Sequence, residues 1–163
     1  MTDRPRPAFS AAVVLLAIGL GCTTPSTPTA GYVPGLGDLM LLAQIQHSKL
    51  WFAGEAGNWR LASYELDELQ EGFAAAARLH PRHKDSPLPI PDLIQKIMGG
   101  PMSDLRAAIK AKDETAFAKG FDALSTGCNS CHQATNFGFA VITRPSSNPY
   151  SNQSFKPERP PGS

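Results

Sequence analysis

The chain has 163 residues, of which 42% are hydrophobic and 18% charged, and its formal net charge is +1. Once terminal segments are set aside, a chain of this length holds about one domain. Lysine and arginine are interspersed with acidic residues and form no basic block, so the composition predicts neither a nucleic acid nor an anionic membrane surface as a partner.

Residues 1–21 have the pattern of an export signal, with Arg4 and Arg6 ahead of an apolar run from Ala11 to Leu20. This run is too short to span a bilayer as a stable helix. Cys22 follows, and the polar, proline-rich stretch 22–34 has the composition of a flexible tether. The start of the chain resembles a bacterial lipoprotein leader, in which Cys22 would be lipidated. The alternative is ordinary cleavage, which would release a soluble exported protein.

Within residues 35–142 the apolar residues recur at helical spacing, which predicts an all-α domain. A first helix is expected from about Leu36 to Ala53. It should end in the segment Gly54–Gly57, where glycine can adopt the left-handed conformation that stops a helix. The predicted inner stripe of this helix consists of Leu36, Met40 or Leu39, Ala43, His47, Leu50 and Gly54.

A second helix is expected to begin after Asn58, whose side chain can accept a hydrogen bond from a free N–H of the first turn, and to continue to about Leu79. Its predicted seam is Ala62, Leu66, Leu69, Phe73 and Ala76, whereas Glu65, Glu68 and Glu71 fall on the face expected to meet solvent. A proline-rich loop follows. His80 and His83 lie at its start, and without a third ligand they are expected to be solvated rather than to bind a metal.

A third helix is predicted to open with Pro91 in its first turn, where the missing N–H costs little. Gly99-Gly100-Pro101 interrupts the pattern, but the phase of the apolar stripe survives, which favours one kinked helix over two. Met98 and Met102 flank the interruption and are expected to pack in the core. A fourth helix should start near Asp113, a second candidate N-cap.

The fourth helix carries the most specific motif of the chain. Its apolar stripe, spaced by four and three residues, is Phe117, Phe121, Leu124, Cys128 and Cys131. The segment Cys128-Asn129-Ser130-Cys131-His132 has the Cys-x-x-Cys-His pattern by which c-type haem is attached, with two thioethers to the porphyrin and an imidazole to the iron. The adjacent histidine and the lack of a second cysteine pair disfavour a redox dithiol or a zinc site.

Together, the four helices and the motif on the last of them resemble the class II c-type cytochromes, the cytochrome c prime group. The resemblance covers about residues 36–137 and implies an antiparallel four-helix bundle with one covalent haem c near the end of the last helix. It implies that Cys128 and Cys131 form the thioethers, that His132 is the proximal ligand of the iron, and that a homodimer is possible. This chain departs from the family where it continues past the motif through 133–139 into a long tail.

The sixth position of the iron would decide the chemistry, because methionine or histidine makes an electron carrier and an empty site leaves room for a gas. Met40 is expected at a depth similar to that of His132 in an antiparallel pair of helices. His47 lies deeper along the helix. It is nevertheless a candidate, because an imidazole on an otherwise apolar stripe requires a partner, and the iron would be close to it. The third possibility is that neither binds the iron, with Met40 filling the core and His47 bonded to a carbonyl group or to Gln44.

The tail, residues 143–163, is rich in proline, serine and asparagine and is predicted to be irregular. Such a segment is usually disordered. Tyr150 and Phe155 support a second hypothesis, in which the tail is a strap across the haem edge with Arg144 near a propionate. Trp51 and Trp59 are expected to close the end of the bundle opposite the haem.

The favoured function is that of an exported mono-haem c-type cytochrome that passes single electrons to redox partner proteins. It would lie on the periplasmic side of a bacterial membrane, either lipid-anchored or soluble. One alternative is a five-coordinate haem protein that binds nitric oxide or carbon monoxide, and another is a helical lipoprotein without haem. No arrangement of a nucleophile and a base and no phosphate-binding loop predicts an enzyme.

Overall fold

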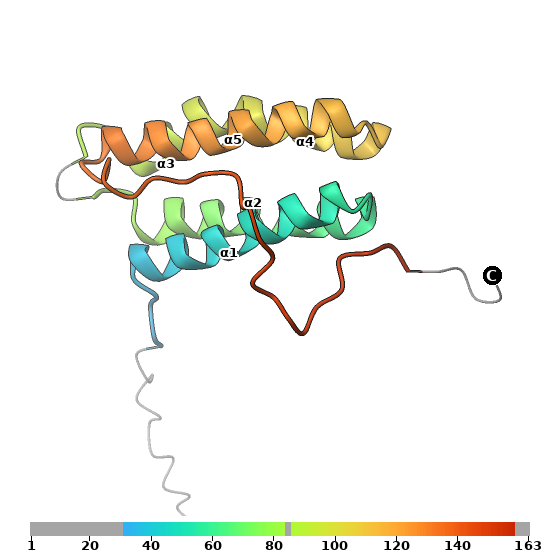
Figure 1. Cartoon of the computed structure of the whole chain (residues 1–163). Coiled ribbons are helices and arrows are strands. Elements are labelled where there is room, and N and C mark those ends of the chain that lie inside the picture. Colours follow the sequence, from blue (N-terminus) through green and yellow to red (C-terminus); the bar gives the residue numbers. More distant parts are fainter. Residues whose placement is uncertain (1–30, 84–85, 159–163) are drawn as a thin grey trace, which may run out of the picture. The chain divides into compact units, whose positions relative to one another are not determined.

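A computed structural model describes residues 31–83 and 86–158 of the chain (Figure 1). Helices are the only regular secondary structure of the described residues, which contain no strand, as the sequence predicts. The predicted signal segment and residues 22–30 of the predicted tether, Cys22 included, lie outside them. None of the helices within the described ranges combines the length and apolar character that a membrane span requires. The elements in chain order are α1 (Leu36–Glu55), α2 (Trp59–Leu79), α3 (Ile90–Leu93), the π-helix η1 (Ile94–Met98), α4 (Gly99–Ala111) and α5 (Glu114–Ala134).

Helices α1 and α2 form a pair joined by the short turn 56–58, and they pack against each other along their length (Figure 1). Gly57 has a φ of 69°, so the turn uses the left-handed conformation that the sequence predicts here. The Asn58 side chain accepts a hydrogen bond from the Leu61 N–H at 3.2 Å, which confirms the predicted N-cap. The whole predicted seam of α2 is buried.

Elements α3, η1 and α4 form one uninterrupted helical run, which confirms the prediction of a single helix. The interruption takes the form of the π-helix η1, which ends just before Gly99. Pro101 has no N–H to offer the carbonyl of Ile97, and its ring crowds that carbonyl. A wider turn immediately before the proline accommodates both effects, because π-bulges are a recurrent response to a break in the hydrogen-bond ladder.

Helix α5 packs along α4 and begins at the predicted cap, where the Asp113 carboxylate accepts a hydrogen bond from the Ala116 N–H at 2.9 Å. It ends at Ala134, and Asn136 adopts a φ of 63° just beyond. Asparagine is one of the few residues other than glycine that tolerates this left-handed conformation. The chain therefore turns back on itself directly after the Cys-x-x-Cys-His segment.

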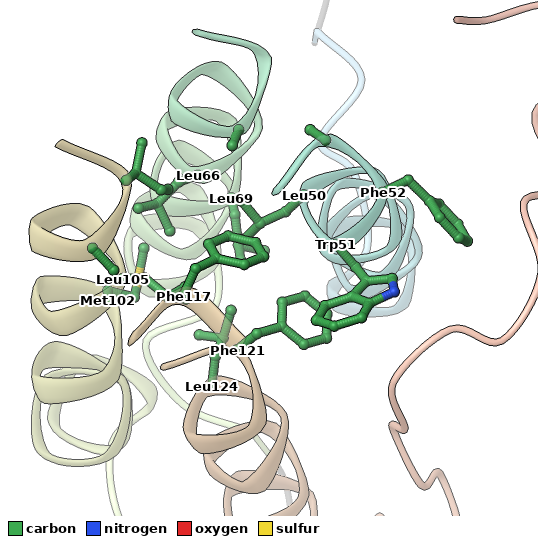
Figure 2. Packing of buried hydrophobic residues seen from close by; sticks show 14 of the residues in the cluster. Leu50, Trp51, Phe52, Leu66, Leu69, Met102, Leu105, Phe117, Phe121 and Leu124 are labelled. Carbon is green, nitrogen blue, oxygen red and sulfur yellow. The ribbon is translucent and has the colours of Figure 1, made fainter. Parts of the chain in front are cut away.

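The core is built where the two pairs of helices face each other (Figure 2). Phe121 of α5 is fully buried, and its ring lies 5.0 Å from that of Trp51 and 6.2 Å from that of Phe117, measured between centroids. Leu50 and Leu66 are fully buried in the same cluster. Trp51 and Trp59 both contact Phe117; Trp51 belongs to the buried core, and Trp59 is partly buried against it.

One prediction on the solvated face of α2 is wrong. Glu65 is only 3% exposed, whereas the pattern places it with Glu68 and Glu71 away from the core. Burial raises the pKa of the Glu65 carboxyl, and the nearby Lys49 opposes that rise. The helical period alone misses this residue because the neighbouring helix α1 covers more of α2 than a narrow seam requires.

Residues 143–158 of the tail form no helix or strand, which agrees with the irregular structure predicted from composition (Figure 1). They contact the helices at several points, so this part of the tail is not disordered. Arg144 forms a two-pronged ion pair with Asp122 of α5, at 2.6 and 3.1 Å, and its guanidinium lies 4.3 Å from the ring centroid of Trp51. Farther along, Phe155 is buried against Phe52 at 5.6 Å between ring centroids. Aromatic anchors and one paired arginine thus hold an irregular segment in place.

Candidate functional site

A cavity of about 360 Å³ lies at the end of the domain that contains the Cys-x-x-Cys-His segment. This volume falls within the range of roughly 300–1,000 Å³ that is typical of sites for small molecules and cofactors. Helices α1, α2 and α5, the α3–η1 segment and the stretch 137–142 all contribute to its wall. Most of its lining is apolar: Leu36, Leu41, Ala43, Leu69, Phe73, Ala76, Ile90, Ile94, Phe137, Ala140 and Ile142.

The cavity brings together the residues that the sequence analysis singled out. Cys128, Cys131 and His132 line it from α5, and Met40 and His47 line it from α1. These two sets of residues are far apart in the sequence, so their convergence is a property of the fold. Met98, which was expected only to pack in the core, lines the same cavity.

Both cysteines are free thiols and partly buried. Burial raises the pKa of the Cys128 thiol to about 12, with a smaller contribution from the neighbouring Cys131. Burial also raises the pKa of Cys131. Redox dithiols depend on a lowered cysteine pKa, because the thiolate is the nucleophile. The surroundings of this pair therefore disfavour thiol–disulfide exchange.

The ring of His132 is held by a hydrogen bond from its Nδ1 to the backbone carbonyl of Ala140. A carbonyl oxygen can only accept, so Nδ1 carries a proton, and in the neutral ring the lone pair is on Nε2. This tautomer is the one that a histidine ligand with a hydrogen-bonded Nδ1 presents to a metal. In this tautomer Nε2 is the ring nitrogen of His132 that could act as a ligand.

His47 is buried, with 4% of its surface exposed, and its Nε2 lies 2.9 Å from the Ser125 hydroxyl. The Ser125 hydroxyl donates its own proton to the carbonyl of Phe121 at 2.9 Å, so it accepts from His47. His47 is therefore the neutral Nε2–H tautomer, and its partner is a serine rather than a carbonyl or Gln44. Direct binding of a metal through Nε2 would require this hydrogen bond to break.

Burial lowers the pKa of His47 from 6.5 to about 4, and this shift predicts how the stability of the haem-free chain depends on pH. The unfolded chain binds a proton at this imidazole below pH 6.5, whereas the folded chain resists protonation until about pH 4. The contribution is complete above pH 6.5 and is lost as the pH falls toward 4. Between pH 7.5 and 5 the free energy of unfolding should fall by about 2 kcal/mol through this group.

Urea denaturation of the haem-free chain at both pH values checks this expectation, with His47→Gln as the non-titrating control. The difference in stability between pH 7.5 and pH 5 should be smaller by about 2 kcal/mol in the variant. An equal difference in both proteins would show that the His47 imidazole accepts a proton as readily in the folded chain as in the unfolded one.

The two remaining histidines have partners of their own. The Nε2 of His80 lies 2.8 Å from the Pro34 carbonyl, and the ring of His83 packs against Phe137 at 5.1 Å between centroids. Within residues 31–83 and 86–158, no three histidine, cysteine or acidic side chains are grouped so that they could hold one metal ion among them. Both histidines are half-buried and in contact with other residues rather than solvated as expected, and His83 also lines the cavity.

Sequence reasoning missed the stretch 137–142 as part of the site. This stretch supplies Phe137, Ala140 and Ile142 to the cavity wall and the carbonyl to which His132 donates. Asn136, which takes the left-handed conformation, was the one available sign that the chain would turn back here. The structure does not bring Arg144 to this site, as the strap hypothesis requires. The Arg144 guanidinium is paired with Asp122, and Arg144 is not among the residues that line the cavity.

Comparison of the chain with protein-family models, with curated proteins and with solved structures finds no match. What the protein does must therefore be inferred from the chemistry that this cavity brings together.

Proposed function

We propose that the protein is an exported mono-haem c-type cytochrome that transfers single electrons to redox partner proteins. In this proposal the helices form an antiparallel four-helix bundle, Cys128 and Cys131 hold the haem as thioethers, and His132 is its proximal ligand. The export signal and Cys22 would place the protein on the periplasmic side of a bacterial membrane, with a lipid anchor.

The observation that carries the proposal is the convergence, in one apolar cavity, of Cys128, Cys131 and His132 with the two possible ligands from α1. The donor set fits haem c, since it offers two thiols and one imidazole whose Nε2 lone pair is free. The apolar wall fits the porphyrin face, because a low-polarity surrounding controls the access of solvent to a metal site. Haem supplies an iron that changes its oxidation state by one electron.

The contacts of Met40 and His47 favour one of them as the sixth ligand. The hydrogen bond to Ser125 engages the Nε2 of His47, whereas Met40 is half-buried and lines the cavity without an electrostatic partner to lose. Met40 is therefore the better placed of the two. Methionine as the second axial ligand would raise the reduction potential, as expected of an electron carrier.

The same observation favours one alternative, a five-coordinate haem protein that binds a diatomic gas. If Met40 stays in the cavity wall and His47 stays bonded to Ser125, neither side chain would bind the iron, and the apolar cavity would leave room for a gas. Such a pocket suits nitric oxide or carbon monoxide. Addition of carbon monoxide to the reduced protein separates the two functions: an immediate spectral shift indicates an open site, and a spectrum that does not change indicates a bound protein ligand.

Covalent attachment is tested by exporting the full chain in a bacterial host with a haem-attachment system and staining a denaturing gel for haem. We expect a stained band for the native chain and none for the double variant Cys128→Ala/Cys131→Ala. Ser130→Ala is the matched control, because Ser130 lies between the two cysteines and is exposed. This control should stain like the native chain. An unstained native band, with the mass of the unmodified polypeptide, would rule out both haem functions.

A further inference from the structure

The stretch 137–142 returns to α5 and provides the carbonyl that fixes the ring of His132. Two backbone hydrogen bonds start this return, from the Phe137 N–H to the His132 carbonyl at 2.7 Å and from the Ala140 N–H to the Phe137 carbonyl at 2.8 Å. The stretch has no regular secondary structure that would hold the Ala140 carbonyl in position. Some other contact must keep this carbonyl on the imidazole.

The side chain of Asn129 makes that contact. Its Nδ2 donates to the Ile142 carbonyl at 2.8 Å, and its Oδ1 accepts from the Ile142 N–H at 2.7 Å. One amide side chain thus satisfies both polar groups of a backbone residue, as a neighbouring strand would do. A pair of hydrogen bonds fixes orientation as well as distance, and Ile142 lies only two residues beyond Ala140.

Asn129 and His132 are three residues apart on α5, so their side chains lie on neighbouring parts of one helix face. Two side chains of helix α5 therefore bind the backbone of the stretch 137–142. Asn129 forms hydrogen bonds with Ile142, and His132 donates to the carbonyl of Ala140. The Arg144–Asp122 ion pair holds the next residues of the chain to the same helix. Asn129 is one of the two positions between the cysteines that the haem-attachment pattern leaves variable. In this chain its side chain holds the backbone at Ile142 in place.

We infer that Asn129 is a positioning residue for His132, which fixes the Nδ1–H tautomer of the imidazole through the 140–142 backbone. The consequence for a bound iron rests on the proposed function. A hydrogen bond at Nδ1 makes an imidazole a more basic ligand, and a more basic ligand favours the oxidised metal. Loss of Asn129 should therefore leave the haem attached and shift the reduction potential upward.

The first test uses the full chain produced without haem and measures the ¹⁵N NMR shifts of the His132 ring. The native chain should show a protonated Nδ1. Asn129→Ala should reduce the Nδ1-protonated fraction, and Ser130→Ala should leave it unchanged. Asn129→Asp keeps the oxygen that accepts from Ile142 but loses the donor to its carbonyl, so its effect should be intermediate. This variant preserves the side-chain shape if Asn129→Ala fails to fold.

The second test measures the reduction potential of the haem-loaded proteins. Asn129→Ala should have a higher potential than the native chain and Ser130→Ala the same potential. If the variants at Asn129 carry haem and match the native chain in both the ring tautomer and the potential, the inference is wrong and the proposed function stands. If the native chain takes up no haem, the proposed function is wrong, and the tautomer measurement alone decides the role of Asn129.

Discussion

Replacing Phe121 with alanine is expected to lower the free energy of unfolding by about 3–5 kcal/mol, the largest change we foresee for a single residue. Phe121 is completely buried, and its ring contacts those of Trp51 and Phe117 (Figure 2). It also contacts the ring of His47. The rigid helices on either side can close only part of the resulting space, so the lost burial and the remaining cavity both count against the folded state. Urea denaturation of the haem-free chain at pH 7.5 measures the difference.

Tyr64→Ala provides the control for this prediction. Tyr64 lies on α2 and is 55% exposed, so removing its ring should change the stability by less than about 0.5 kcal/mol. A loss below about 1 kcal/mol for Phe121→Ala would contradict the packing around this ring. The Phe121 ring lies 4.3 Å from that of His47, measured between centroids. The variant should therefore also leave the α1 residues that line the cavity less tightly packed.

The helices could be predicted from the sequence because their signals are local. Asn58 and Asp113 each cap a helix through their own side chain, and the apolar stripe of α5 repeats with the helical period. The π-helix η1 could be anticipated only as a disturbance before Pro101. Its exact form depends on how α5 packs against it: a Cβ at Gly127 would lie 2.9 Å from the Met98 sulfur.

The tail and Glu65 could not be predicted, because their positions depend on contacts between distant residues. Composition describes residues 143–158 correctly as irregular, but it cannot reveal that Arg144 meets Asp122 or that Phe155 reaches Phe52. A few anchors are enough to hold an irregular segment when its aromatic side chains find apolar hollows on the helices. The burial of Glu65 likewise depends on how α1 lies over α2.

In the candidate site, too, the residues with local sequence signals could be predicted and their distant partners could not. Cys128, Cys131 and His132 are adjacent in a recognisable pattern, and Met40 and His47 could be selected as residues of the inner stripe of the first helix. The partners of these residues, Ser125 for His47 and the Ala140 carbonyl for His132, come from packing and from the return of the chain after α5. These partners set the tautomers of the two imidazoles, so the tautomers could not be predicted from the sequence alone.

The second large effect is expected where α1 and α5 touch. A Cβ built on Gly54 would lie 2.1 Å from two carbon atoms of the Phe117 ring, far inside van der Waals contact. Phe117 is 2% exposed and is enclosed by Trp51 and Trp59, so its ring cannot move away freely. Gly54→Ala should therefore lower the free energy of unfolding by about 1–3 kcal/mol, although alanine favours helix more than glycine does.

Gly72→Ala separates the effect of space from the effect of helix propensity. Gly72 lies inside α2, and a Cβ there would meet only the Gln46 side-chain oxygen, at an ordinary 3.6 Å. With room for the methyl group, alanine should raise the free energy of unfolding by about 0.5–1 kcal/mol. The same substitution in two helices should thus have opposite signs in urea denaturation. If Gly54→Ala also stabilises the chain, α1 and α5 do not approach each other as closely as the Phe117 ring requires, and the α1 wall of the cavity would have to lie farther from α5.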